Sequence, residues 1–252
     1  MRSALARRVL RVAVPAAVIL AIWQAAIVLL EIRPYILPAP LRVAEALADD
    51  WRFLAYHGFI TLSEIVLGLL LGAALGVATA LTVSLFPRAG GVMLPVMVAS
   101  QALPVFAIAP LLVIWFGYGL ASKVVMATLI IFFPVASAFL DGLRRTNTGF
   151  LELARLSGAS PWRTLLLVRL PAALSGLASG LRVAAAVAPI GAVVGEWVGA
   201  SKGLGFVMLQ ANARVQTDRV FAALFILALT AILVRALVER LSRKMVPWVA
   251  ED

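Results

Sequence analysis

Long apolar segments separated by short polar stretches dominate the sequence. Six of them are long enough to cross a bilayer, because a helix rises about 1.5 Å per residue and the hydrocarbon core is about 30 Å thick. They cover residues 12–30, 60–86, 92–116, 123–140, 175–198 and 220–237. This pattern predicts an all-α polytopic membrane protein with six transmembrane helices.

The first apolar segment follows a basic N-terminal arm. It is longer than the roughly 7 to 15 apolar residues of a signal peptide, and no obvious small-residue cleavage site follows it. We therefore interpret it as a retained span. Residues 31–56 are of mixed polarity and contain three prolines, which predicts an outer connection with a short helix at 43–53.

The second and third segments contain small and helix-bending residues. Glycines recur every four residues in the second segment, so they share one helix face and allow a neighbouring backbone to approach. We favour packing within the chain over a seam between two copies. Three prolines in the third segment free carbonyl groups and bend the helix, which makes this segment the best candidate for a pathway wall. These residues are Gly68, Gly72, Gly76, Pro95, Pro104 and Pro110.

Composition supports a membrane protein and excludes several classes of site. Apolar residues make up 63% of the chain and charged residues 13%, about half the share that is typical of soluble domains. The absence of cysteine excludes disulfides and thiolate chemistry, and a single histidine makes a metal site improbable. His57 is expected at the membrane interface. We expect neither a catalytic site nor a metal or other cofactor.

Basic residues indicate how the chain is oriented. Of the 22 lysines and arginines, the proposed inner segments hold 14 and the outer segments seven, and Arg182 lies inside a span. This bias predicts that both termini are cytoplasmic. Because the basic residues cluster at the ends of apolar runs and form no stripe with aromatic residues, they do not predict nucleic-acid binding.

Few polar residues lie inside the predicted spans. Arg182 is on the order of 10 Å from the inner end of the fifth segment, where a charge costs roughly 2.5 to 3.5 kcal/mol on insertion scales. It therefore either extends to the surface or a structural partner, or serves a pathway or gate. Glu64 and Glu196 are expected at the interface. Our candidate pathway residues are Gln101, Pro104, Arg182 and Glu196.

The polar stretch 152–171, between the fourth and fifth segments, predicts two short helices joined by a turn. Gly158 can take the positive φ that ends the first helix, and Ser160 and Pro161 fit the start of a second. We expect the second helix to stop near Leu170, because Pro171 follows it. Five arginines in or beside the stretch favour its cytoplasmic location.

At these residues the chain resembles the membrane subunits of ABC importers. Their cytoplasmic loop has Glu-Ala-Ala, a Gly four residues on, and a hydrophobic-x-Leu-Pro ending. Five residues match, while Leu153 and Val168 stand where the family has alanine and isoleucine. The resemblance implies a type I permease fold whose coupling helices dock into a groove on an ATPase. The coupling residues would be Glu152, Leu153, Ala154, Gly158, Ala159, Leu170 and Pro171.

The resemblance also implies partners and a location. The assembly would hold two permease copies as a homodimer, two cytoplasmic ATP-binding subunits and an extracytoplasmic solute-binding protein, in the inner membrane of a bacterium. The permease itself would not be an enzyme. The chain would divide into residues 1–57, with the arm, first span and outer connection, and a permease core, 58–252, with the coupling loop at 141–172.

Two further stretches resemble a particular branch of the family. Residues 192–199 and 210–214 are similar to permeases for the pyrimidine precursor of thiamine, within a branch that also serves taurine, alkanesulfonates and nitrate. A secondary transporter or channel driven by an ion gradient is the alternative. Such a protein is expected to have internal repeats or buried coupling carboxylates, and the sequence shows no repeat and few acids within the spans.

Overall fold

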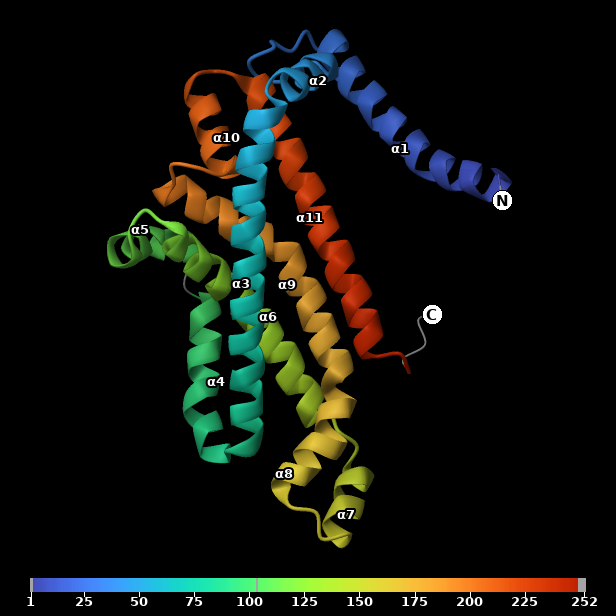
Figure 1. Cartoon of the computed structure of the whole chain (residues 1–252), viewed down its shortest axis with the longest axis vertical. Helices are drawn as coiled ribbons and strands as arrows, with labels where there is room; N and C mark the ends of the chain where they lie inside the picture. The colour runs from blue at the N-terminus through green and yellow to red at the C-terminus, as the bar shows by residue number, and fades with distance from the viewer. Residues whose placement is uncertain (1, 103, 249–252) are drawn as a thin grey trace.

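The protein is a bundle of helices, known here from a computed structural model. It describes the backbone of residues 2–102 and 104–248, and the side chains of these residues except 2–12 and Pro87. Within these ranges the regular elements are all helical (Figure 1). They are α1 (Arg2–Leu29), α2 (Pro40–Asp49), α3 (Trp51–Leu85), α4 (Pro87–Ala102), α5 (Val105–Phe116), α6 (Leu120–Arg144), α7 (Thr148–Leu156), α8 (Pro161–Thr164), a π-helical turn (Leu165–Arg169), α9 (Leu170–Gly199), α10 (Leu204–Ala213) and α11 (Thr217–Met245).

Four of the described helices are long and apolar enough to cross a membrane, and the pair α4 and α5 makes a fifth span if it is counted as one. The four are α3, α6, α11 and the continuous helix that ends with α9. The apolar part of α1, Ala13–Leu29, is shorter, so the sixth predicted span stays a prediction. The all-α, multi-span architecture is confirmed.

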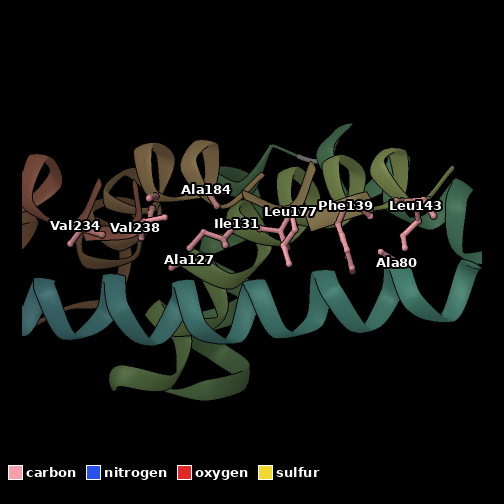
Figure 2. Close-up of a cluster of buried hydrophobic side chains, with 14 of the residues drawn as sticks. Ala80, Ala127, Ile131, Phe139, Leu143, Leu177, Ala184, Val234 and Val238 are labelled. Carbon is pink, nitrogen blue, oxygen red and sulfur yellow. The ribbon is translucent and has the colours of Figure 1, made fainter. Parts of the chain in front are cut away.

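The centre of the bundle is formed by α6 packed between α3 and α9. The glycines of α3 lie against α6: a Cβ on Gly72 would come within 2.6 Å of Ile131, and one on Gly76 within 3.0 Å of Val135. These contacts confirm that the glycine face packs within the chain. Around it, Figure 2 shows Ile131 and Phe139 of α6 and Leu177 of α9 in one buried apolar cluster.

The third predicted span is broken. Helices α4 and α5 meet at an angle of 101° next to Pro104, which precedes α5 in an extended conformation. Since proline has no N–H and clashes with the preceding turn, it cannot continue α4 as a straight helix. Ala109 and Leu112 of α5 then pack against Met126 of α6, so α5 lies across the bundle (Figure 1).

Two predicted boundaries, at the end of α2 and at the start of α3, were wrong. The short helix expected at 43–53 ends at Asp49, and the second span begins at Trp51 instead of residue 60. The corner between them is held by the carboxylate of Asp50, which contacts the Arg219 guanidinium of α11 at 2.6 and 3.1 Å. The outer loop expected after α9 contains a further helix, α10, which packs against α11.

Candidate functional site

The predicted two-helix stretch forms a hairpin, α7 and α8, that projects from one end of the bundle (Figure 1). Helix α7 begins after Asn147, whose side-chain oxygen accepts a hydrogen bond from the N–H of Gly149 at 2.8 Å. After α7, Gly158 has a φ of +69°, which confirms the predicted turn. This conformation is costly for residues with a Cβ, so glycine allows the chain to reverse here.

The second helix of the hairpin starts as predicted. The side chain of Ser160 accepts a hydrogen bond from the N–H of Arg163 at 3.3 Å, and Pro161 occupies the first helical position. A proline suits this position, because the first helical N–H has no partner within the helix. The start of α8 therefore follows from local sequence alone.

The predicted end of that helix near Leu170 was wrong. The helix runs on without interruption from Pro161 to Gly199, so the hairpin continues directly into α9. A π-helical turn precedes Pro171, in which the N–H of Leu170 bonds to the carbonyl of Leu165, five residues back. The wider turn accommodates a proline that a regular α-helical ladder would not.

The hairpin exposes apolar side chains. Leu156 is 87% exposed, and Phe150, Leu153 and Trp162 are also exposed, whereas Ala154 is buried. Among the other predicted coupling residues, Glu152, Gly158 and Pro171 are exposed, and Ala159 and Leu170 are half-buried. Exposed apolar groups clustered on a projecting element are typical of a protein-binding surface.

A cluster of buried polar groups lies at the end of the bundle opposite the hairpin. The ammonium group of Lys123 in α6 contacts Glu64 Oε1 in α3 at 2.9 Å, and the Glu64 side chain is completely buried. Glu64 Oε2 has no hydrogen-bond partner among the described residues. A buried ion pair of this kind is sensitive to the loss of either partner.

The second half of the cluster holds the connection between α9 and α10. The hydroxyl of Thr61 donates to Glu196 Oε1 at 2.6 Å, while Glu196 Oε2 accepts from the N–H of Gly205. The N–H of Leu204 donates to Thr61 Oγ1 at 2.8 Å. These contacts satisfy the first N–H groups of α10, which have no partners within that helix.

His57 completes this polar cluster. Its Nδ1 accepts a hydrogen bond from the N–H of Gly203 at 2.9 Å, and the residue is 5% exposed. The interfacial positions expected for His57, Glu64 and Glu196 were therefore wrong. The chain after α9 folds back over these groups, and the closely spaced glycines Gly203 and Gly205, which allow that approach, were the available signal in the sequence.

The four candidate pathway residues do not lie together. Gln101 and Pro104 are exposed beside the break between α4 and α5. Glu196 is buried in the polar cluster. Arg182, by contrast, is half-buried on α9 in the hairpin half of the bundle, where its Nε donates to the carbonyl of Ala178 at 3.3 Å.

Comparison with known proteins agrees with this arrangement. Residues 65–247 match the family of binding-protein-dependent transport system inner membrane components. A probable ABC transporter permease of Haemophilus influenzae is 56% identical over 83% of this chain and 86% of that protein. The formylaminopyrimidine permease ThiX of Halalkalibacterium halodurans is 37% identical over 86% and 87%, and the riboflavin permease RibX of Chloroflexus aurantiacus is 36% identical over 92% and 87%.

A solved structure confirms the fold. A chain of the methionine ABC transporter MetNI in inward-facing form superposes with a TM-score of 0.57 at 22% identity, over 79% of this chain and 96% of that one. It has the type I permease fold that the hairpin motif implied. With a family match that covers most of the sequence, this chain belongs to the inner-membrane permease components of binding-protein-dependent ABC importers.

Proposed function

We propose that this permease moves a small nitrogen heterocycle across the membrane and takes its driving force from ATPase subunits that bind the α7–α8 hairpin. The observation that carries the second half of this proposal is the hairpin itself. It exposes Phe150, Leu153, Leu156 and Trp162, and it is continuous with the long helix that ends at Gly199. Movement of a docked partner would pass along that helix into the bundle.

Each predicted coupling residue has a role in this proposal. Glu152 and Leu153 are exposed and would contact the ATPase, and the buried Ala154 would support the fold of the hairpin. Gly158 and Ala159 form the turn, and Leu170 and Pro171 follow the π-helical turn that joins the hairpin to α9. Two ATPase subunits would engage two hairpins in a permease homodimer, each from the cytoplasmic side, where both termini of the chain would also lie.

The proposed solute class rests on the relatives and on the branch resemblance. ThiX, a relative with 37% identity, is named for formylaminopyrimidine, and RibX, with 36%, for riboflavin. Both solutes contain a planar nitrogen heterocycle. We favour the pyrimidine precursor of thiamine, with taurine, alkanesulfonates and nitrate as the competing solutes, and expect a solute-binding protein to deliver it. Residues 58–252 would form the translocating core, and residues 1–57 would add the peripheral first span.

The test is uptake by the reconstituted transporter. Proteoliposomes that hold the permease, its ATPase and its binding protein should accumulate formylaminopyrimidine only when ATP is supplied on the hairpin side. Riboflavin and taurine, each at the same concentration, serve as competitors. Uptake that follows an imposed proton or sodium gradient without ATP would instead support a secondary transporter.

A further inference from the structure

A cavity between α9 and α11 has the chemistry of an anion site. Its volume is about 300 Å³, and it is lined by Ser175, Ala178, Arg182, Ser242, Arg243, Val246 and Pro247. It follows directly on the apolar cluster that joins the two helices through Val234 and Val238. On α9 the lining residues recur at intervals of three and four, so they share one helix face. The opposite wall is formed by the last turn of α11 and the two residues that follow it.

Ser242 is the first indication that this cavity binds a ligand. Its side chain is 2% exposed, and its hydroxyl has no hydrogen-bond partner among the described residues. The other hydroxyls of α11 have partners: Thr230 donates to the carbonyl of Ile226 and Thr217 to the carbonyl of Tyr35, both at 2.8 Å. Because a buried hydroxyl without a partner is unfavourable, a ligand oxygen that accepts from it would recover part of that free energy.

Arg182 is the second indication. Its Nε is held by the carbonyl of Ala178 at 3.3 Å, which fixes the guanidinium at the cavity wall. Guanidinium groups bind two oxygens of a phosphate at once, and they do so more strongly where water is partly excluded. A charge within an apolar span is unfavourable, so an anionic ligand beside Arg182 would stabilise it.

The charge around the cavity favours an anion over a cation. Arg243 also lines it and is bound to Glu239 at 2.8 Å, so one carboxylate offsets one of the two guanidinium groups. Further basic residues, Arg235, Arg240 and Lys244, follow along the same end of α11. Among the described residues around the cavity, positive charges therefore outnumber negative ones even with Glu239 ionised.

We propose that the cavity binds a phosphate group, which Arg182 holds in a forked contact and to which Ser242 donates a hydrogen bond. The group belongs either to the headgroup of an anionic phospholipid or to a soluble phosphate compound. This site is separate from the coupling hairpin and from the solute choice proposed above. Occupation would tie α9 to α11 beyond their last apolar contact.

Binding measurements on the full-length chain distinguish the two sources. In native mass spectrometry, the detergent-purified protein should retain phosphatidylglycerol in preference to phosphatidylcholine if the ligand is a headgroup. If the ligand is soluble, inorganic phosphate should raise the thermal unfolding temperature in neutral detergent more than chloride does at equal ionic strength. Either result supports the site, and the absence of both overturns it.

Variants locate the binding. Arg182→Gln should weaken the binding of whichever probe binds by about ten-fold or more, because a charge-assisted contact is lost. Ser242→Ala removes only the hydroxyl and should weaken it by a smaller factor. Arg240→Gln removes the same charge from α11 outside the cavity, so it should weaken binding far less than Arg182→Gln does. If Arg182→Gln does not accumulate, Arg182→Lys tests the forked contact with the charge retained. Parental affinity in the Arg182 and Ser242 variants would overturn the proposal.

Discussion

Lys123 of α6 and Glu64 of α3 form an ion pair of 2.9 Å in which both side chains are almost fully shielded from the surroundings. A lone buried charge is far less favourable than a paired one, so the two residues depend on each other. Lys123→Met should lower the free energy of unfolding by about 3 to 5 kcal/mol. Thermal unfolding in detergent measures this effect.

The matching double variant tests whether that loss comes from an unpaired charge. Lys123→Met combined with Glu64→Gln removes both charges, so it should be clearly more stable than Lys123→Met alone. If the double variant loses as much stability as Lys123→Met and Glu64→Gln lose together, the two residues do not interact, and the pairing is contradicted. Arg42→Met is a suitable control, because Arg42 pairs with Glu45 on the exposed surface, where the effect should be within about 1 kcal/mol.

Glu196→Gln should loosen α10. An amide oxygen can still accept from Thr61, but an amide nitrogen in the second position cannot accept from the N–H of Gly205. We expect α10 to become the first part of the chain to exchange its amide hydrogens, with the protection of α6 unchanged. Hydrogen exchange followed by mass spectrometry gives this comparison, and equal protection of α10 in both proteins would refute the role of Glu196.

Gly72→Ala should destabilise the contact between α3 and α6. The added Cβ would meet Ile131 at 2.6 Å and the carbonyl of Thr128 at 3.2 Å, and overpacking of this kind costs about 1 to 3 kcal/mol. Gly91→Ala provides the matched control, since no heavy atom lies within 4 Å of its Cβ position. The difference in unfolding temperature between the two variants measures the packing cost directly.

Gly158→Asp should leave the bundle folded and uncouple it from ATP. The position has open space around it, so the cost arises from a positive φ and from a new charge at the proposed docking surface. ATP-dependent uptake should fall while membrane abundance persists. Ser157→Ala, an exposed neighbour with a φ of −77°, should transport normally. Full transport by Gly158→Asp would remove the hairpin from the coupling mechanism.

Orientation can be tested without reference to the family. Reporter fusions after Lys244 and within residues 146–160 should both report the cytoplasm, and fusions within residues 202–217 should report the outside. A fusion after Leu30 should also report the outside if α1 crosses the membrane. Opposite results at the first two sites would overturn the orientation derived from the basic residues.

Features set by neighbours in sequence were predictable, and features set by distant contacts were not. The turn at Gly158, the cap at Ser160 and the packing face that includes Gly72 depend on short-range geometry or spacing, and each was confirmed. Pro171 misled the prediction because the wider turn before it relieves the clash that normally ends a helix. Local rules do not anticipate such a turn.

The polar cluster of the candidate site was not predictable for the same reason, because distant contacts form it. Glu196 and Thr61 are 135 residues apart, and their contact exists only because the chain after α9 folds back onto α3. Acidic residues near the ends of apolar segments usually lie at the membrane interface. The position of Glu196 in the sequence therefore predicted an interfacial side chain instead of a buried one. The ion pair of Glu64 with Lys123 likewise could not be predicted from the sequence, because it forms only where α3 packs against α6.

The length of the continuous helix from the hairpin to Gly199 determines how far a movement of the hairpin would be carried into the bundle. Its 39 residues have a length along the helix axis of about 58 Å at 1.5 Å per residue, which is roughly twice the thickness of the hydrocarbon core, although α9 bends near its end (Figure 1). A tilt of about 5° displaces a point about 30 Å from the pivot, one hydrocarbon thickness away, by about 3 Å. Glu196 lies near the far end of this lever, so a small rotation of the docked hairpin would be magnified where α10 is held.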